Sequence, residues 1–353
     1  MSRISSPSEK LTELGKTVLR SVECGDYPSF DIPDRSTSNI VFNQETGQFI
    51  LGNAKSRRDS SNIKHVKSFM QLMWTASYAK RLLNTGRTSS LRDLYYSSEA
   101  FGVDFKNQDE SDRIVSDLEC ITGHPREAFG IFPEEHSSIY GRVVMKYTVS
   151  GYENREVDLT ISPDGLPIGP ALTTAEPVRT DAKMILAVES GGMFSRLIET
   201  RSWERFEIIL VHLGGQAPRS TRRLMHCLHK DLDLPVAIFT DGDPWGMHIA
   251  QVIIAGSANA AHIDGLAIPD AKWIGVTAQD IVDFDLPNEA LTDRDLRRLD
   301  ELTRDSRYLR EDWQKEIESY QQLRKKAEQQ AFSRYGMDFV VDEYLPQKLL
   351  KIK

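Results

Sequence analysis

The sequence predicts an α/β protein of two domains, in which a small helical domain with a following strand precedes a doubly wound parallel sheet. Three observations predict this fold. The length of 353 residues is typical of two domains. Helical spacing of apolar residues fills much of the segment 62–122. From residue 182 onward, short apolar runs that are typical of buried strands alternate with helical segments.

Composition excludes several classes of protein. With 40% apolar residues and no run of 18 uninterrupted apolar residues, the chain has no expected membrane span. The N-terminal Met1-Ser-Arg-Ile-Ser-Ser-Pro7 lacks the apolar core of a signal peptide, so we expect a cytoplasmic protein. Three cysteines lie about a hundred residues apart, which fits neither a zinc site nor a disulfide framework.

Residues 1–61 are predicted to form an N-terminal extension that contains an amphipathic helix and a hairpin. The apolar positions of the helix recur at helical spacing and are Leu11, Leu14, Val18 and Val22. The hairpin is expected over residues 39–51, with a glycine at its turn.

Residues 62–161 are predicted to form three helices and then a strand. The first helix runs from Ile63 to a stop near Gly86, the second opens at the capping box Ser90-Leu-Arg-Asp93, and the third carries an apolar stripe from Ile114 and ends at Gly123. A strand is expected over 141–149. Three small helices and a β-wing are typical of a winged-helix (CAP-like) α+β domain, which can place a helix in the major groove of DNA.

A proline-rich linker is expected over 162–181, followed by the second domain over 182–353. Its strands are predicted at 184–188, 206–211, 235–239 and 273–276, with a charged helical extension beyond about residue 290. Strand–loop–helix units repeated in this way imply a parallel sheet. Ligands of such sheets gather at the carboxyl ends of the strands, where Glu189, Asp241 and Asp243 fall.

These three carboxylates would repel one another unless a cation lies among them. Mg²⁺ prefers a few carboxylates with room for water, and it can stabilise charge on a transferring phosphoryl group. Alternatively, Asp241 caps the following helix and Glu189 is a surface residue. An Asp-x-Asp pair also occurs in haloacid-dehalogenase phosphatases and some glycosyltransferases, but the phosphatase pattern has Thr or Val where this chain has Trp245. A Glu after one strand and Asp-x-Asp two strands later is typical of Toprim domains.

Basic residues concentrate in one zone of an acidic chain. Residues 55–92 carry a net charge of +8, whereas the whole chain carries −8. Such a zone is a candidate contact for the DNA phosphate backbone, and a solvated helix face is the alternative. The candidate phosphate contacts are Lys64, Lys67, Lys80 and Arg87 in this zone, and Arg219, Arg222 and Arg223 at the start of a helix beside the acidic residues.

Two adjacent tyrosines follow an arginine in Arg92-Asp-Leu-Tyr-Tyr96. On a helix, Tyr95 shares the apolar face, while Arg92 and Tyr96 are i, i+4 neighbours on the adjoining face. A phenol needs a base or a nearby cation to act as a nucleophile, because its pKa is ordinarily near 10. A guanidinium beside it would favour phenolate and could hold a phosphate oxygen. The alternative is a core aromatic pair with a surface arginine.

Together, these motifs resemble the A subunit of type IIB DNA topoisomerases, topoisomerase VI. The likeness covers nearly the whole chain. Besides Arg92-Asp-Leu-Tyr-Tyr96 and Glu189, it includes Gly215-Gln-Ala-Pro-Arg219, Phe239-Thr-Asp-Gly-Asp-Pro-Trp-Gly246, Trp273-Ile-Gly-Val276 and Tyr344-Leu-Pro-Gln-Lys348. The same family contains the eukaryotic protein that makes meiotic double-strand breaks. One departure from the family pattern is Ser190, where we expect Lys or Thr after the glutamate.

The resemblance implies a mechanism and an assembly. Tyr96 would attack a DNA phosphodiester and become joined to the 5′ end, with Arg92 positioning the phosphate and Mg²⁺ held by Glu189, Asp241 and Asp243. A homodimer would place Tyr96 of one chain at the acidic site of the other. No Walker-type ATP-binding run occurs in the sequence. ATP-driven strand passage would therefore need the family's GHKL-type ATPase B subunit, in an A2B2 heterotetramer that acts on double-stranded DNA at the nucleoid.

Three functional hypotheses remain open at the level of sequence. The first is the DNA-cleaving subunit of topoisomerase VI, and the second is a break-forming family member without strand passage. The third is a non-catalytic DNA-binding scaffold, which would require the acids or the tyrosine to be missing. The amphipathic helix over 8–22 is a candidate docking element for the B subunit, unless it packs on its own domain.

Overall fold

The chain folds as two compact units that exchange short segments. The computed structural model describes residues 5–133, 137–350 and 352. The first unit comprises Met1–Val41, Ile50–Glu134 and Ala258–Asp264, and the second comprises Phe42–Phe49, Glu135–Ser257 and Gly265–Lys353. The second unit therefore begins near residue 135, whereas the sequence places a domain boundary at the segment 162–181.

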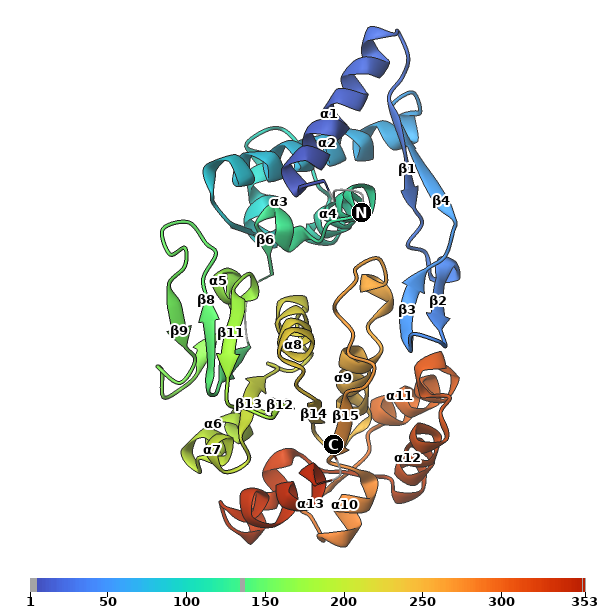
Figure 1. Ribbon diagram of the computed structural model, residues 1–353. Helices are drawn as coiled ribbons and strands as arrows, with labels where there is room; N and C mark the ends of the chain where they lie inside the picture. The colour runs from blue at the N-terminus through green and yellow to red at the C-terminus, as the bar shows by residue number, and fades with distance from the viewer. Residues whose placement is uncertain (1–4, 134–136, 351, 353) are drawn as a thin grey trace. The chain divides into compact units, whose positions relative to one another are not determined.

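The first unit is mainly helical (Figure 1). Its elements are α1 (Pro7–Glu23), β1 (Ser29–Pro33), the 3₁₀ turn η1 (Thr37–Asn39), β4 (Lys55–Asp59), α2 (Ile63–Thr85), β5 (Ser89–Ser90), α3 (Leu91–Glu99), α4 (Gln108–Thr122), the 3₁₀ turns η2 (Arg126–Phe129) and η3 (Ala258–Ala260), and β6 (Ile131–Phe132). Strands β1 and β4 form an antiparallel ribbon, and β5 pairs with β6 in parallel. The hairpin strands β2 (Ile40–Asn43) and β3 (Gln48–Leu51) each begin or end in this unit.

The predicted helices of this unit are confirmed with their ends. Helix α2 ends at Gly86, α4 ends at Gly123, and the Ser90–Asp93 capping box opens α3. Their buried faces meet in a core that includes Leu72, Leu94 and Leu118. The strand expected as a wing, however, forms in the second unit as β8 (Val143–Lys146). It pairs there with two strands that also belong to the second unit. The winged-helix assignment thus stays a prediction.

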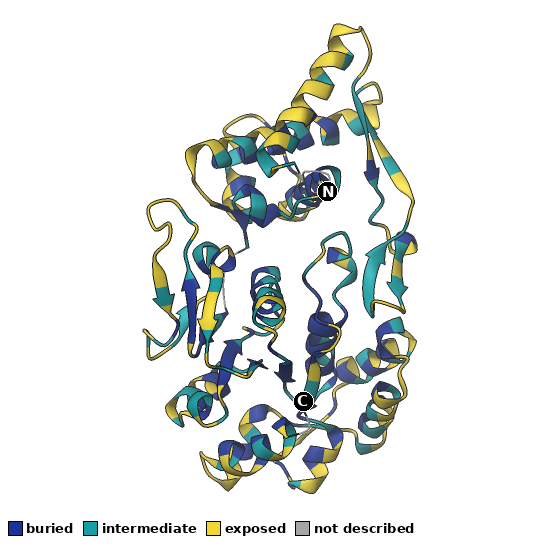
Figure 2. Ribbon diagram, in the orientation of Figure 1, coloured by how far each residue is buried: buried dark blue, intermediate teal, exposed yellow. Residues whose placement is uncertain are grey.

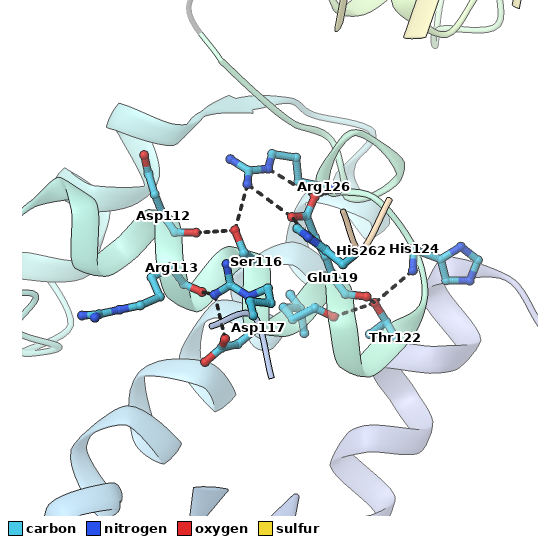
Figure 3. Close-up of polar contacts among 11 residues, drawn as sticks. Asp112, Arg113, Ser116, Asp117, Glu119, Thr122, His124, Arg126 and His262 are labelled. Carbon is cyan, nitrogen blue, oxygen red and sulfur yellow. Dashed lines mark hydrogen bonds and ion pairs between the residues drawn. The ribbon is translucent and has the colours of Figure 1, made fainter. Parts of the chain in front are cut away.

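A buried polar network lies within the first unit (Figure 3). The Glu119 carboxylate on α4 accepts hydrogen bonds from the Arg126 backbone N–H at 2.7 Å and from the Arg126 guanidinium at 3.2 Å. His262 Nε2, from the segment that returns to this unit, lies 3.0 Å from the same carboxylate. Two residues earlier on α4, Asp117 accepts hydrogen bonds from Arg35 and Arg58. These buried charges are paired, as the cost of desolvation requires.

The second unit is built on a six-stranded mixed sheet with the order β10-β7-β13-β12-β14-β15. Four of its strands are parallel: β12 (Met184–Val188), β13 (Ile208–His212), β14 (Val236–Phe239) and β15 (Lys272–Gly275). Strands β12 to β14 are buried along almost their whole length (Figure 2). Apolar runs covered on both faces are typical of parallel sheets. The four predicted strands of this domain are therefore confirmed.

The remaining elements surround this sheet. They are β7 (Ser138–Tyr140), β9 (Glu156–Asp158), β10 (Leu166–Pro167), α5 (Pro170–Thr173), β11 (Glu176–Thr180), α6 (Gly191–Glu199), α7 (Ser202–Arg205), α8 (Arg219–Leu232), α9 (Pro244–Ile254), α10 (Ala278–Asp283), β16 (Glu289–Ala290), α11 (Asp293–Arg304), η4 (Ser306–Tyr308), α12 (Glu311–Leu323), β17 (Lys325–Lys326), η5 (Gln329–Tyr335), the π-helical turn η6 (Val340–Tyr344) and α13 (Leu345–Leu349). Helices α6 to α9 connect successive parallel strands. None of the helices in the described ranges is long and apolar enough to cross a membrane.

The segment expected as a linker, 162–181, carries structure of its own. Its strand β10 pairs with β7, which extends the main sheet antiparallel to β13. Its strand β11 pairs with β8, which in turn pairs with β9. The prolines of this stretch are accommodated because Pro167 and Pro177 lie in edge strands and Pro170 begins a helix.

Candidate active site

Tyr96 lies on a short helix of the first unit with its phenol exposed. Helix α3 is fixed at its start by the reciprocal capping box of Ser90 and Asp93. Tyr95 packs against the core, as the helical spacing predicts, and Tyr96 is 54% exposed. The Arg92 guanidinium carbon lies 6.0 Å from the centre of the Tyr96 ring. Arg92 and Tyr96 therefore share one accessible face of a rigidly started helix.

The three acids gather at the carboxyl ends of adjacent parallel strands in the second unit. Glu189 follows β12, and Asp241 and Asp243 follow β14, which is hydrogen-bonded directly to β12. Glu189 Oε2 accepts a hydrogen bond from the Asp241 backbone N–H at 2.9 Å. Asp243 caps α9, because its Oδ1 accepts from the N–H groups of Trp245 and Gly246 at 2.8 and 2.7 Å. The structure thus brings the predicted acids together.

Two glycines explain the sequence around these acids. A Cβ on Gly246 would overlap the carbonyl oxygen of Asp241, so only glycine lets α9 start this close to the acidic loop. A Cβ on Gly242 would lie 3.1 Å from the Ala327 carbonyl oxygen, within the bridge that Gly242 and Ala327 form with two backbone hydrogen bonds. The pattern Asp-Gly-Asp-Pro-Trp-Gly is therefore a backbone requirement as well as a set of candidate ligands.

Burial and mutual repulsion shift the protonation of these acids. Burial, with a further contribution from the charge of Asp241, raises the pKa of Glu189 to about 8. Burial also raises the pKa of Asp241 to about 6, although the N–H of Gln329 opposes the shift. The pKa of Asp243 is raised by burial as well. Three carboxyl groups that resist ionisation side by side form a site that a cation would stabilise.

A segment far along the chain holds this acidic loop, and sequence reasoning missed it. The Gln329 backbone N–H donates to Asp241 Oδ1 at 2.9 Å. Lys326 donates to Asp295 at 3.1 Å, and Asp295 also accepts from the Trp245 indole N–H at 3.2 Å. In the sequence this segment is only part of a charged tail, and no spacing connects it with strand ends about 90 residues earlier. A resemblance to the acid motif alone could not have found it.

An open cavity of about 560 Å³ adjoins the acids. Its lining includes Asp241, Asp243, Lys326 and Arg334. Nearby, the guanidinium carbons of Arg294 and Arg298 lie 4.7 and 5.1 Å from the Trp245 ring centre. Acids beside cations in an open hollow suit a phosphate group that is bound through both a metal ion and basic side chains.

The residues present fit Mg²⁺. Each of the three carboxylates uses one oxygen in the hydrogen bonds given above, and within the described ranges the second oxygen of each accepts none. Hard carboxylate oxygens in an open, wet hollow are the ligands that Mg²⁺ prefers. A closed cage is not preformed, since no three His, Cys, Asp or Glu side chains in those ranges already have the spacing of a metal site.

The expected phosphate contacts have different surroundings. Lys80 Nζ donates to Ser8 and Thr12 of α1, so it is engaged within the first unit. Lys67 lies 3.7 Å from Glu110, whereas Lys64 and Arg87 are exposed. In the second unit Arg219, Arg222 and Arg223 occupy the first turns of α8, and Arg222 is buried. Ser190, the departure from the family pattern, caps α6 by accepting from the Met193 N–H.

Comparison with known proteins assigns both units. Residues 184–349 match the Toprim domain model of the topoisomerase 6 A subunit and Spo11, and residues 67–131 match the type IIB DNA topoisomerase model. The chain is 42% identical to the A subunit of type 2 DNA topoisomerase 6 from Methanothermobacter thermautotrophicus, over 99% of this chain and 98% of the relative. The corresponding protein of Archaeoglobus fulgidus is 38% identical, over 96% and 95%. The chain therefore belongs to the family of topoisomerase VI A subunits, within the type IIB DNA topoisomerases.

Proposed function

We propose that this chain cleaves DNA with the Tyr96 phenol oxygen as the nucleophile. The observation that carries the proposal is the exposed Tyr96 beside Arg92 on a capped helix, in a chain whose other unit holds three acids at strand ends. Attack on a backbone phosphorus forms the bond between the tyrosine oxygen and phosphorus and breaks the bond to the 3′ oxygen. The phenol proton passes to solvent, and the 3′ oxygen leaves as a hydroxyl. One phosphodiester replaces another, so the reverse reaction reseals the strand.

The acids and Arg92 have separate tasks in this scheme. Glu189, Asp241 and Asp243 would hold Mg²⁺, which when bound stabilises the negative charge that develops on the phosphoryl group. Arg92 would hold a phosphate oxygen in line with the phenol, since a guanidinium binds phosphate with two parallel hydrogen bonds. Lys326 and Arg334, which line the cavity beside the acids, would bind the neighbouring phosphates of the strand.

The cleavage of both strands calls for an assembly. Each chain supplies one Tyr96, so a double-strand break needs a homodimer, and we propose that Tyr96 of one chain meets the acids of the other. The relatives are named as A subunits, which supports a B subunit partner, and the sequence has no Walker-type run of its own. We propose a GHKL-type ATPase B subunit in an A2B2 heterotetramer, acting on DNA at the nucleoid in the cytoplasm.

Relaxation of supercoiled plasmid by the chain with its B subunit, ATP and Mg²⁺ tests this proposal. Wild type should relax the plasmid, and Asp241→Asn should lower the rate by about a hundredfold or more, because a lost metal ligand removes several kcal/mol of charge stabilisation. Asp300→Asn is the control, since Asp300 pairs with Arg304 on the surface of α11. Linear DNA without relaxed topoisomers would instead indicate a break-forming protein. Equal rates for Asp241→Asn and Asp300→Asn would contradict the role of the acids.

A further inference from the structure

Gln329 contacts both of the loops that carry the acids. It is fully buried at the start of η5, 139 residues from Ser190 and 90 from Phe239. Its side-chain Oε1 accepts a hydrogen bond from the Ser190 backbone N–H at 2.9 Å, and its Nε2 donates to the Phe239 carbonyl at 3.0 Å. Its own backbone N–H donates to Asp241 Oδ1 at 2.9 Å.

These contacts complete the ladder between two parallel strands. The last backbone hydrogen bond there joins the Glu189 N–H to the Phe239 carbonyl at 3.0 Å. Beyond it the chains diverge into the acidic loops, so the next N–H, of Ser190, bonds to the Gln329 side chain in place of a strand. Buried backbone groups need partners, and the Gln329 amide supplies an acceptor and a donor at this point. Among uncharged side chains, only an amide offers both at once, and only glutamine has this length.

The position of the amide relative to the acids sets it apart from an ordinary buried polar group. One of its partners is the residue directly after Glu189, and the other lies two residues before Asp241. A third bond goes to the Asp241 carboxylate itself, and the Gly242–Ala327 bridge lies alongside. The separation of Glu189 from Asp241 therefore depends on one side chain that is distant in sequence.

We propose that Gln329 is a positioning residue that fixes the spacing of Glu189 and Asp241 and thereby sets the Mg²⁺ affinity of the site. This inference rests on the proposed function, because it takes these acids as metal ligands. Groups that orient metal ligands typically change metal affinity by about 10- to 100-fold when they are replaced.

Gln329→Met is the direct test, because methionine has a similar length and volume but neither donates nor accepts strongly. The backbone N–H to Asp241 is retained. Gln251→Met is the matched control: Gln251 is also a buried glutamine in the same unit, and from α9 it donates to the Arg307 carbonyl at 3.3 Å rather than to the acidic loops. Gln329→Asn is a second variant, which stays polar but is one methylene too short to reach both backbone groups.

Calorimetric titration of the full chain with Mg²⁺ alone, without DNA or the B subunit, is the measurement. We expect Gln329→Met and Gln329→Asn to weaken Mg²⁺ binding by about tenfold or more, and Gln251→Met to bind like wild type. Thermal unfolding in EDTA identifies a variant that does not fold, in which case the other variant decides. The Mg²⁺ concentration for half-maximal plasmid cleavage should shift by the same factor.

Several outcomes would overturn the inference. Wild-type Mg²⁺ affinity in a folded Gln329 variant would do so, as would an equal loss in Gln251→Met, which would indicate a general effect of removing a buried amide. Failure of the proposed function has a different signature. In that case wild type itself would show no Mg²⁺-dependent cleavage.

Discussion

At the scale of single residues, Lys80 and Lys64 show that charge alone does not assign a role. Both lie in the basic zone of residues 55–92 and on the same helix, α2. Lys80 Nζ donates to the Ser8 carbonyl at 3.0 Å and to the hydroxyls of Ser8 and Thr12 at 2.6 and 2.8 Å, which ties α2 to α1. Lys64 is exposed at the other end of α2. Of the two lysines, Lys64 is the one that presents its charge to solvent.

Substitution of these two lysines should therefore have opposite effects. Lys64→Met should weaken DNA binding and reduce the slope of log affinity against log salt by about 0.9, the value for one phosphate contact. Lys80→Met should leave that slope unchanged and lower the free energy of unfolding by about 1–3 kcal/mol, because three hydrogen bonds to a charged group are lost. Salt-dependent DNA binding and urea unfolding of both variants make the comparison. A flattened slope for Lys80→Met would contradict it.

The buried Glu119 carboxylate supports a second prediction at this scale. Arg126→Met would leave it buried without the guanidinium that lies 3.2 Å away. A buried charge that loses its partner typically costs about 3–5 kcal/mol. We expect urea unfolding to show a loss of this size, and the double variant Glu119→Leu, Arg126→Met to recover part of it because no carboxylate then stays buried at this position. A double variant that is less stable than the single one would argue against this account.

At the scale of elements, α1 uses only part of its apolar stripe. Leu11 and Leu14 are buried against the first unit, whereas Leu19 and Val22, in the last two turns, are 56% and 59% exposed. Lys80 fixes the first turns of the same helix. The helix therefore packs on its own unit through one half and presents apolar side chains through the other. The exposed half is the part that fits the docking of a B subunit.

Point substitutions test this docking better than deletion of the helix, which would also remove Leu11 and Leu14 from the core. The double variant Leu19→Asp, Val22→Asp should weaken binding of the B subunit, while the free energy of unfolding changes by less than about 0.5 kcal/mol, as is usual for exposed positions. Lys16→Asp, an exposed change on the same helix, controls for the added charge. Calorimetric titration with the B subunit measures the effect. Undiminished binding by the double variant would exclude α1 from the interface.

At the scale of the whole molecule, local signals predict the elements well and assign them to units less well. The four parallel strands lie within two residues of their predicted bounds, and the helix ends at Gly86 and Gly123 are as predicted. These features depend on apolar runs and on nearby capping residues. The exchanged segments Phe42–Phe49 and Ala258–Asp264 depend instead on contacts that are distant in sequence. The three-residue strand β7, which adds an antiparallel edge to the main sheet, is too short to show a period.

The candidate site divides in the same way. Glu189 and Asp241 could be predicted because a parallel sheet brings the ends of its strands together. Gln329 could not, because nothing in its local sequence indicates that its amide completes the ladder between β12 and β14. Helical spacing alone distinguishes Tyr96 from Tyr95, and the exposure of Tyr96 agrees with that distinction.

The central claim is that Tyr96 is the nucleophile, and detergent-trapped cleavage of supercoiled plasmid tests it most directly. The chain would be assayed with its B subunit, Mg²⁺ and an ATP analogue, and wild type would be compared with Tyr95→Phe and Tyr96→Phe. We predict linear DNA with protein-blocked 5′ ends from wild type and Tyr95→Phe, and none from Tyr96→Phe. Trapped cleavage by Tyr96→Phe at the wild-type level would contradict the account and would favour a metal-dependent hydrolase.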